Sequence, residues 1–210
     1  LRSNILKRLL SINHFAQIDK GRVDKKALIS GKKFKQLTTT HQRYANVFEQ
    51  MGFKIDFENP TFPEPVALKG NLQNFIKNDK KNIGIAPFAA HVGKMYPLEL
   101  MNRIIAQLSE EYNIILFGGG EEETAQLSKI SSQFENTVTV AGKLNLDKEL
   151  DIITNLDLML SMDSGNAHLA AMLGVKVVTV WGVTHPFAGF LPFNHSMEST
   201  LLADRTKFPK

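Results

Sequence analysis

The stretch at 161–171, SMDSGNAHLAA, places an acid, two hydroxyls, a glycine and a histidine where an apolar run gives way to a helical pattern. Met162 is expected to end a strand and Ser164 or Gly165 to begin a helix, so the first N–H groups of that helix lack partners. Those groups carry the positive end of the helix dipole and suit an anion such as a phosphate. Gly165 lets a ligand approach the backbone closely, and the His168 side chain leans back toward the same anion.

Each of these residues also has an ordinary structural explanation. Asp163 and Ser164 are common types at a helix N-cap, and a single histidine such as His168 can bond a local carbonyl. Lys94 lies with Gly93 in the segment APFAAHVGKMYP, where it could neutralise a diphosphate or be a solvated surface lysine. Residue types alone therefore leave two interpretations open, an anion site and a plain strand-to-helix turn.

A glycine-acid segment, FGGGEEE at 117–123, follows another apolar run. It matches neither the dinucleotide pattern G-x-G-x-x-G nor the phosphate-loop pattern G-x-x-x-x-G-K-[ST], so these two nucleotide-binding classes lose support. Its glutamates could accept hydrogen bonds from ribose hydroxyls, although acids at the start of a helix are common without any ligand.

From residue 81 onward, short apolar runs alternate with patterns of helical period. The expected strands lie within 82–88, 113–120, 137–142, 156–162 and 175–182. The expected helices lie within 96–112, 121–134, 146–155 and 164–173. This alternation predicts an α/β fold, a doubly wound parallel sheet of Rossmann type. In such a sheet the ligand lies at the carboxyl ends of the strands, where the segments quoted above would converge.

The first 70 residues show weaker periodicity. A basic helix is expected at 3–10, a short strand, FAQID, at 15–19, and at 41–51 a helix with one apolar face that comprises Tyr44, Val47, Phe48 and Met51. A connector with three prolines follows and predicts a domain boundary near Gly70, which divides the chain into 1–70 and 71–210. Because the sequence opens within a helical pattern without an initiator methionine, we expect a fragment of a longer protein.

Charge is distributed unevenly along the chain. Residues 1–50 hold 11 Lys/Arg against 3 Asp/Glu, whereas the remainder holds 14 against 18. The first part suits an anionic partner, such as a phosphorylated glycan, a phospholipid surface or nucleic acid, or is a solvated lysine-rich surface. Basic and aromatic residues are not interleaved, so RNA has no support and nucleic acid is not an expected partner.

Composition excludes several classes of protein. The 210 residues contain no cysteine, which rules out disulfides and cysteine-based metal sites or nucleophiles. No apolar run approaches the roughly 20 residues of a spanning helix, so membrane contact is expected to be peripheral at most. No cluster of residues has convincing metal-ligand spacing.

Several ordered motifs resemble those of glycosyltransferase family 9, the ADP-heptose:lipopolysaccharide heptosyltransferases. Asp163-Ser164-Gly165 with His168, and LAAMLGVKVVTVWGVTHP after it, are similar to the family pattern D-[ST]-G-x-x-H-x-A-A-x-L-G, a strand, then G-x-[TS]-x-P. The segment APFAAHVGKMYP is similar to the family's loop ending in K-x-W-P, and FGGGEEE to its glycine-acid loop. Together these motifs cover residues 83–193.

The resemblance implies a GT-B fold, with a C-terminal Rossmann-like domain for the donor nucleotide and the remnant of an N-terminal Rossmann-like acceptor domain. It implies that Lys94 and His168 stabilise the leaving group, and that the family's carboxylate base lies outside this chain. The residues implied to bind the donor are Lys94, Gly119, Glu122, Asp163, Ser164, Gly165, Asn166 and His168.

The implied activity is inverting transfer of a heptose from ADP-heptose to an anionic lipopolysaccharide-core acceptor, with no cofactor or metal ion. Its expected place is the cytoplasm or the cytoplasmic face of the inner membrane. Two departures from the family pattern bear on the donor. Ala89 and Ala90 stand where members often have phosphate-binding hydroxyls, and Tyr96 replaces the usual tryptophan.

Two other functions stay open at this point. One is a nucleotide-sugar-binding module, or a degenerate family member, without turnover. The other is a dinucleotide oxidoreductase on the same kind of sheet, which the missing G-x-G-x-x-G pattern disfavours. Fold alone does not decide among them, because doubly wound sheets host many chemistries.

Overall fold

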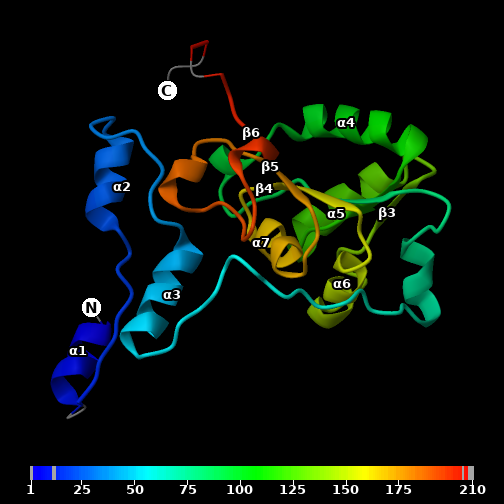
Figure 1. The fold of residues 1–210 in the computed structure, drawn as a ribbon. Coiled ribbons are helices and arrows are strands. Elements are labelled where there is room, and N and C mark those ends of the chain that lie inside the picture. Colours follow the sequence, from blue (N-terminus) through cyan, green and yellow to red (C-terminus); the bar gives the residue numbers. More distant parts are fainter. Residues whose placement is uncertain (1, 11–12, 205, 208–210) are drawn as a thin grey trace. The chain divides into compact units, whose positions relative to one another are not determined.

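The computed structural model describes residues 2–10, 13–204 and 206–207, which fall into two compact units (Figure 1). The first unit comprises Leu1–Pro60 and Pro186–Leu191, and the second comprises Thr61–His185 and Pro192–Lys210. The main segment of the first unit ends at Pro60, before the domain boundary that the sequence predicts near Gly70. That boundary stays a prediction.

The second unit is built on one parallel sheet. Its strands are β1 (Asn82–Ala86), β2 (Asn113–Leu116), β3 (Thr137–Thr139), β4 (Leu158–Met162), β5 (Val177–Val180) and β6 (Thr200–Leu201). They lie in the order β3-β2-β1-β4-β5-β6, the doubly wound order in which the winding reverses between β1 and β4. The predicted α/β sheet of Rossmann type is confirmed, and each of the five predicted strands is present.

Helices cover both faces of this sheet. They are α4 (Leu98–Glu111), α5 (Gly120–Ser131), α6 (Leu146–Ile153) and α7 (Gly165–Met172). Met101 of α4 and Leu127 of α5 pack with Ile114 of β2 on one face, whereas Ala170 of α7 and Ile152 of α6 belong to the core on the other. Figure 1 shows α4 above the strands and α6 and α7 below them. Because both faces are covered, the central strands β1 and β2 are buried along their whole length instead of alternating between buried and exposed residues.

The sixth strand was not predicted. β6 has two residues, Thr200 and Leu201, which pair with Thr179 and Val180 of β5. A two-residue strand has no periodicity that a sequence can display. Short 3-10 turns complete the structure: η1 (Gly70–Phe75), η2 (Val92–Lys94), η3 (Pro186–Ala188) and η4 (Met197–Ser199). None of the helices in the described ranges combines the length and the apolar character that crossing a bilayer requires.

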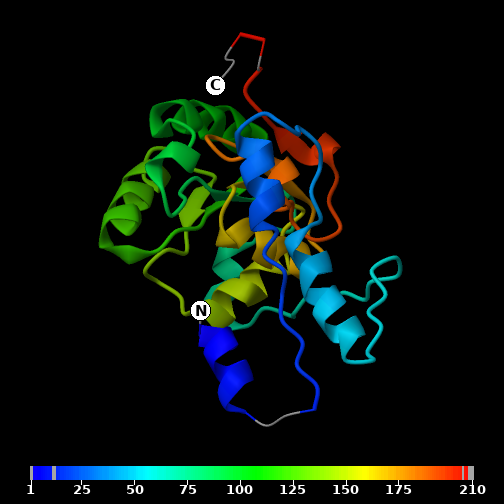
Figure 2. The same cartoon turned by 90° about the vertical axis from the view of Figure 1, so that its left-hand side faces the viewer.

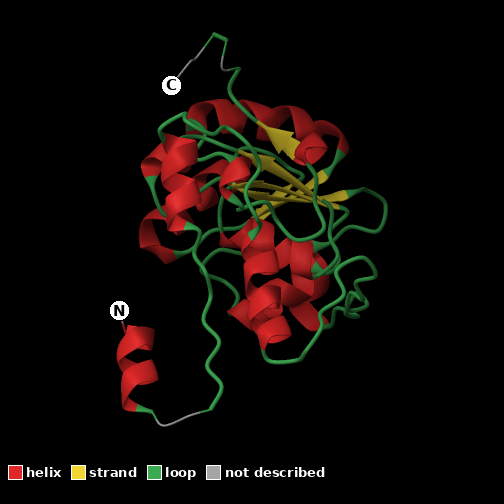
Figure 3. Ribbon diagram, turned by 60° about the vertical axis from the view of Figure 1, so that its left-hand side comes forward, coloured by secondary structure: helices red, strands yellow, loops and turns green. Residues whose placement is uncertain are grey.

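In its described residues, the first unit contains the α-helices α1 (Arg2–Leu9), α2 (Arg22–Ile29) and α3 (Thr40–Gln50). Figure 2 shows them in dark to light blue, separated by extended chain. The strand predicted at 15–19 is wrong, and Figure 3 draws this segment as loop. The segment gains no ladder partner among the described residues; instead the carbonyl oxygen of Asp19 accepts a hydrogen bond from Arg43 Nη1 at 3.0 Å.

The polar side chain of Arg43 organises this unit. Only 7% of Arg43 is exposed, and its Nε donates to the carbonyl oxygen of Thr38 at 3.2 Å. The guanidinium lies against Gly21, whose φ of +60° and missing Cβ allow that approach. The apolar face predicted for α3 is present but largely exposed, with Tyr44 at 56% and Met51 at 57%.

Replacing Arg43 by Met is expected to destabilise the protein by about 1–3 kcal/mol, because the charged, largely buried guanidinium would no longer donate hydrogen bonds to the carbonyl groups of Asp19 and Thr38. The free energy of unfolding in urea measures this loss. Arg22→Met is the matched control, since Arg22 is exposed, and should change stability by less than about 0.5 kcal/mol. Equal effects of the two substitutions would contradict the role assigned to Arg43.

Candidate functional site

The start of α7 leaves backbone N–H groups free of a side-chain cap. β4 ends at Met162, α7 begins at Gly165, and Ser164 occupies the N-cap position in an extended conformation. The Ser164 side chain makes no capping hydrogen bond within the described part of the chain; its Oγ lies 3.0 Å from Ser161 Oγ. The capping role left open for Ser164 is therefore not realised, and the first turn of α7 keeps donors and the positive end of its dipole available to an anion.

The Asp163 carboxylate is the buried charge at this end of the sheet. Its side chain is only 6% exposed, and Oδ2 lies 2.7 Å from Lys94 Nζ, which reaches it from η2 after β1. The same oxygen accepts a hydrogen bond of 2.7 Å from Thr184 Oγ1, in the loop after β5. Asp163 thus joins the loops that follow three strands, instead of capping α7.

His168 lies near this ion pair, on the first part of α7. Desolvation by the surrounding protein lowers the pKa of its imidazole from the usual value; the Asp163 carboxylate opposes this shift and the Lys94 ammonium adds to it. The ring is therefore neutral at pH 7. A neutral imidazole can donate one hydrogen bond and accept another, so it can bind a phosphate or a sugar hydroxyl without adding charge.

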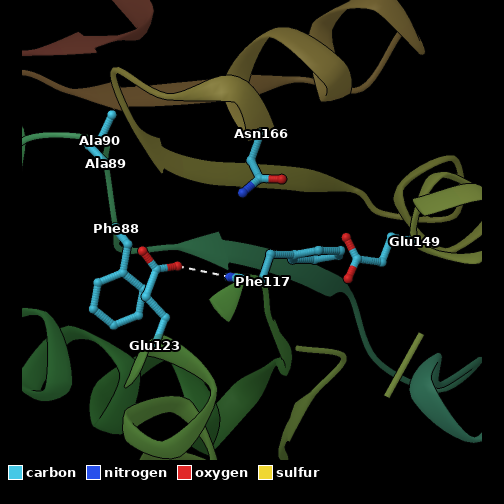
Figure 4. A pocket seen from close by; sticks show the side chains of 9 residues that line it. Phe88, Ala89, Ala90, Phe117, Glu123, Glu149 and Asn166 are labelled. Atoms are coloured by element: carbon cyan, nitrogen blue, oxygen red, sulfur yellow. Dashed lines mark hydrogen bonds between the residues drawn. The ribbon is translucent and has the colours of Figure 1, made fainter. Parts of the chain in front are cut away.

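A cavity of about 300 Å³ opens at the same edge of the sheet. Its lining residues come from the ends of β1 and β2 and from three helices: Phe88, Ala89, Ala90, Phe117, Gly118, Gly119, Glu123, Glu149 and Asn166. Figure 4 shows the amide of Asn166 pointing into the cavity and the carboxyl group of Glu149 beside the Phe117 ring. Such a mixture of aromatic rings and a few polar groups is typical of small-molecule sites.

The acidic residues around the cavity have different roles. Glu123 accepts a hydrogen bond of 2.9 Å from the backbone N–H of Gly119 and so fixes the glycine loop. The carboxyl group of Glu149, in the first turn of α6, has no hydrogen-bond partner among the described residues, and burial raises its pKa. Glu122 is exposed on α5, 3.5 Å from the Gln126 amide, and does not line the cavity.

The structure brings together some of the residues expected from the sequence and separates others. Lys94, Asp163 and His168 form one cluster, next to Ser164 and Gly165 at the start of α7. Gly119 and Asn166 line the cavity, whereas Glu122 does not. Their assignment to a donor remains a prediction.

Several residues at this edge were not predicted as site residues, among them Phe88, Phe117, Glu149 and Thr184. Phe117 directly follows β2 and Phe88 lies just past the end of β1, after Pro87, so the rule that ligands bind at carboxyl ends could have identified them. Thr184 is the hydroxyl residue of the G-x-[TS]-x-P match, so the family pattern could have identified it as a site residue. Glu149 offered none, because an acid in the first turn of a helix is common for the sake of the dipole alone.

The family model of glycosyltransferase family 9 (heptosyltransferase) matches residues 1–210, the whole chain. Among curated proteins, the chain is 30% identical over 125 residues to the lipopolysaccharide core heptosyltransferase OpsX of Haemophilus influenzae, a match covering 58% of this chain and 35% of that protein. It is 26% identical over 140 residues to lipooligosaccharide heptosyltransferase 2 of Campylobacter jejuni, covering 64% of this chain and 40% of the relative.

Solved structures share the fold. The glycosyltransferase family 9 protein of Veillonella parvula matches with a TM-score of 0.68 and 18% identity, over 94% of this chain and 54% of that one. The E. coli heptosyltransferase WaaC with ADP matches with a TM-score of 0.58 and 18% identity, over 77% of this chain and 48% of WaaC. These likenesses confirm the expected α/β fold of GT-B type.

The chain spans between a third and about half of the length of these relatives. Within that span, the family model covers every residue, and the sheet is the doubly wound parallel sheet of a Rossmann-like domain. The motifs at 86–97, 117–123 and 161–186 also gather at one edge of that sheet. The chain belongs to glycosyltransferase family 9.

Proposed function

We propose that this chain is the donor-binding part of an inverting glycosyltransferase that transfers a heptose from ADP-heptose to a lipopolysaccharide-core acceptor. The observation that carries the proposal is the cluster of Lys94, Asp163 and His168 beside the free first turn of α7. A lysine ammonium, a neutral imidazole and the backbone N–H donors of a helix start suit the diphosphate of a nucleotide sugar.

The reaction makes one bond and breaks one. The acceptor hydroxyl oxygen attacks the anomeric carbon, and the bond from that carbon to the diphosphate oxygen breaks, with the electron pair leaving on the diphosphate. The hydroxyl proton passes to a general base. Lys94 and the α7 N–H groups stabilise the negative charge that grows on the leaving diphosphate.

The cavity lies where the rest of the donor would extend. Its volume of about 300 Å³ is enough for a nucleobase, and Phe88 and Phe117 offer apolar surface to such a ring. Glu122, exposed at the start of α5, is free to turn toward a ribose bound at the mouth of the cavity. The proposed ligand is of the same chemical class as the one in a solved relative, since the structure of E. coli WaaC contains ADP.

The acceptor side is proposed from charge. The basic residues of 1–50 suit the phosphates and acidic sugars of a lipopolysaccharide core. Such an acceptor is a glycolipid, so the protein would work in the cytoplasm at the cytoplasmic face of the inner membrane, in peripheral contact with it.

A second candidate function is nucleotide-sugar binding without turnover. Ala89 and Ala90 line the cavity, and they stand where members of the family often carry phosphate-binding hydroxyls. Methyl groups at these positions offer no hydrogen bond to a phosphate, so the donor would depend more heavily on Lys94. Release of ADP from ADP-heptose in the presence of a lipopolysaccharide-core acceptor, measured on the full-length protein, separates the two functions.

Lys94→Met is expected to weaken ADP binding tenfold or more, because it removes the cation that neutralises the diphosphate. Isothermal titration calorimetry measures the affinity, and thermal unfolding checks that the variant stays folded without a cation on Asp163. Lys94→Arg keeps the charge and should retain most of the affinity.

Lys129→Met serves as the control, because Lys129 is exposed in the last turn of α5, away from the glycine loop. It should bind ADP as the unmodified chain does. An unchanged affinity in Lys94→Met, with the fold intact, would refute the role of Lys94.

The donor class is tested by the melting temperature in the presence of ADP-heptose, UDP-sugars, GDP-sugars and NADH. ADP-heptose is expected to give the largest rise, since a ligand at 100 times its Kd stabilises a protein by about 2.7 kcal/mol. NADH, which also contains an ADP unit, should give a smaller rise than ADP-heptose. If no nucleotide sugar raises the melting temperature, the proposal of donor binding fails; a preference for UDP- or GDP-sugars would correct the donor.

A further inference from the structure

The loop after β5 is fixed directly onto the loop after β1. The backbone N–H of Val183 donates to the carbonyl oxygen of Gly93 at 2.9 Å. A Cβ at Gly182 would overlap that carbonyl oxygen and would lie only 3.0 Å from the Cα of Lys94, so the two backbones touch where Gly182 has no side chain. The positions of Lys94 and Thr184 are therefore set together, by one backbone contact.

From this position, Thr184 and Lys94 share one atom of Asp163. Thr184 Oγ1 donates to Asp163 Oδ2 at 2.7 Å, and Lys94 Nζ lies 2.7 Å from the same oxygen. A hydroxyl can donate one hydrogen bond, and the Thr184 hydroxyl donates it to the Asp163 carboxylate. The hydroxyl carries no charge, so it does not compete with Lys94 for an anion.

If the Lys94 ammonium binds a diphosphate as proposed above, it must leave the Asp163 carboxylate with which it is paired. The Asp163 side chain is 6% exposed, and a buried charge that loses its partner is costly. A second donor already on Oδ2 reduces that cost, because the carboxylate keeps a hydrogen bond when the ammonium turns to the ligand. The same donor withdraws charge from Oδ2 and so loosens its hold on Lys94.

We infer that Thr184 is a positioning residue of the donor site. Its hydroxyl holds the Asp163 carboxylate in place and keeps it hydrogen-bonded, so that the Lys94 ammonium can move from Asp163 Oδ2 to the donor diphosphate. The inference rests on the proposed function, and it assigns to Thr184 an effect on nucleotide affinity that acts through Asp163. No covalent bond changes; one N–H donor of Lys94 exchanges a carboxylate oxygen for a phosphate oxygen.

The test measures ADP affinity by calorimetry on the 210-residue chain. Thr184→Val, which keeps the shape and removes the hydroxyl, is expected to weaken ADP binding about tenfold, the scale of one hydrogen bond to a charged group. Thr184→Ser keeps the hydroxyl and should stay within about twofold of the unmodified chain. Thr137→Val is the matched control, because Thr137 is a buried threonine of β3, outside the cluster, whose Oγ1 makes no hydrogen bond among the described residues.

A double substitution separates positioning from direct contact. In an Asp163→Asn background, Thr184→Val should cost less than twofold, because the carboxylate through which Thr184 acts is gone. A persisting tenfold loss would overturn the inference and show that Thr184 contacts the ligand itself.

Thermal unfolding of each variant accompanies the titrations. A lower melting temperature with unchanged ADP affinity in Thr184→Val would also overturn the inference, since a merely structural role predicts that result. If the unmodified chain binds no ADP, the proposed function fails first and this inference fails with it; if the chain binds ADP and Thr184→Val binds it equally well, only the inference fails.

Discussion

The buried negative charge of Asp163 is the constraint on which the ligand end of the sheet depends. A carboxylate in such a place requires donors, and the structure supplies them from two distant segments, Lys94 and Thr184. Satisfying this single group ties together the loops that follow β1, β4 and β5. The geometry of the proposed donor site is thus a consequence of solvating one charge with protein groups instead of water.

The parallel sheet makes that solution possible. All six strands run in the same direction, so every loop after a strand emerges at one edge, and the reversal between β1 and β4 leaves room between their loops. Ala86 of β1 pairs with Ser161 of β4, which puts the chain ends leading to Lys94 and Asp163 on neighbouring strands. The apolar cores on both faces hold this edge in place, since α4 and α7 pack on opposite sides.

The sequence predicted every strand of the sheet unit except β6, but only part of the first unit, for a physical reason. In the first unit the helices expected at 3–10 and 41–51 are present, whereas α2 was not predicted and the strand at 15–19 is wrong. Long apolar runs that alternate with helical periods reflect burial on two faces, and such burial leaves a strong pattern. The segment at 15–19 has an apolar pattern too, but its backbone satisfies Arg43 instead of a neighbouring strand, and no local pattern reveals that contact. In the site, types and positions singled out Lys94, Asp163 and His168; that Asp163 bonds Thr184 instead of capping α7 depends on a contact across 21 residues.

The hexapeptide Pro186–Leu191 has a consequence for how this family could be recombined. It belongs to the first unit, while the residues on both sides belong to the second. Within the first unit, Leu37 N–H donates to the Phe187 carbonyl and Thr40 N–H to that of Gly189, at 2.9 and 2.8 Å. A chimaera that grafts the first unit of one relative onto the sheet of another therefore needs two exchanged segments, 1–60 and 186–191. With a single junction, the segment 186–191 of one protein would have to make these hydrogen bonds with the first unit of another.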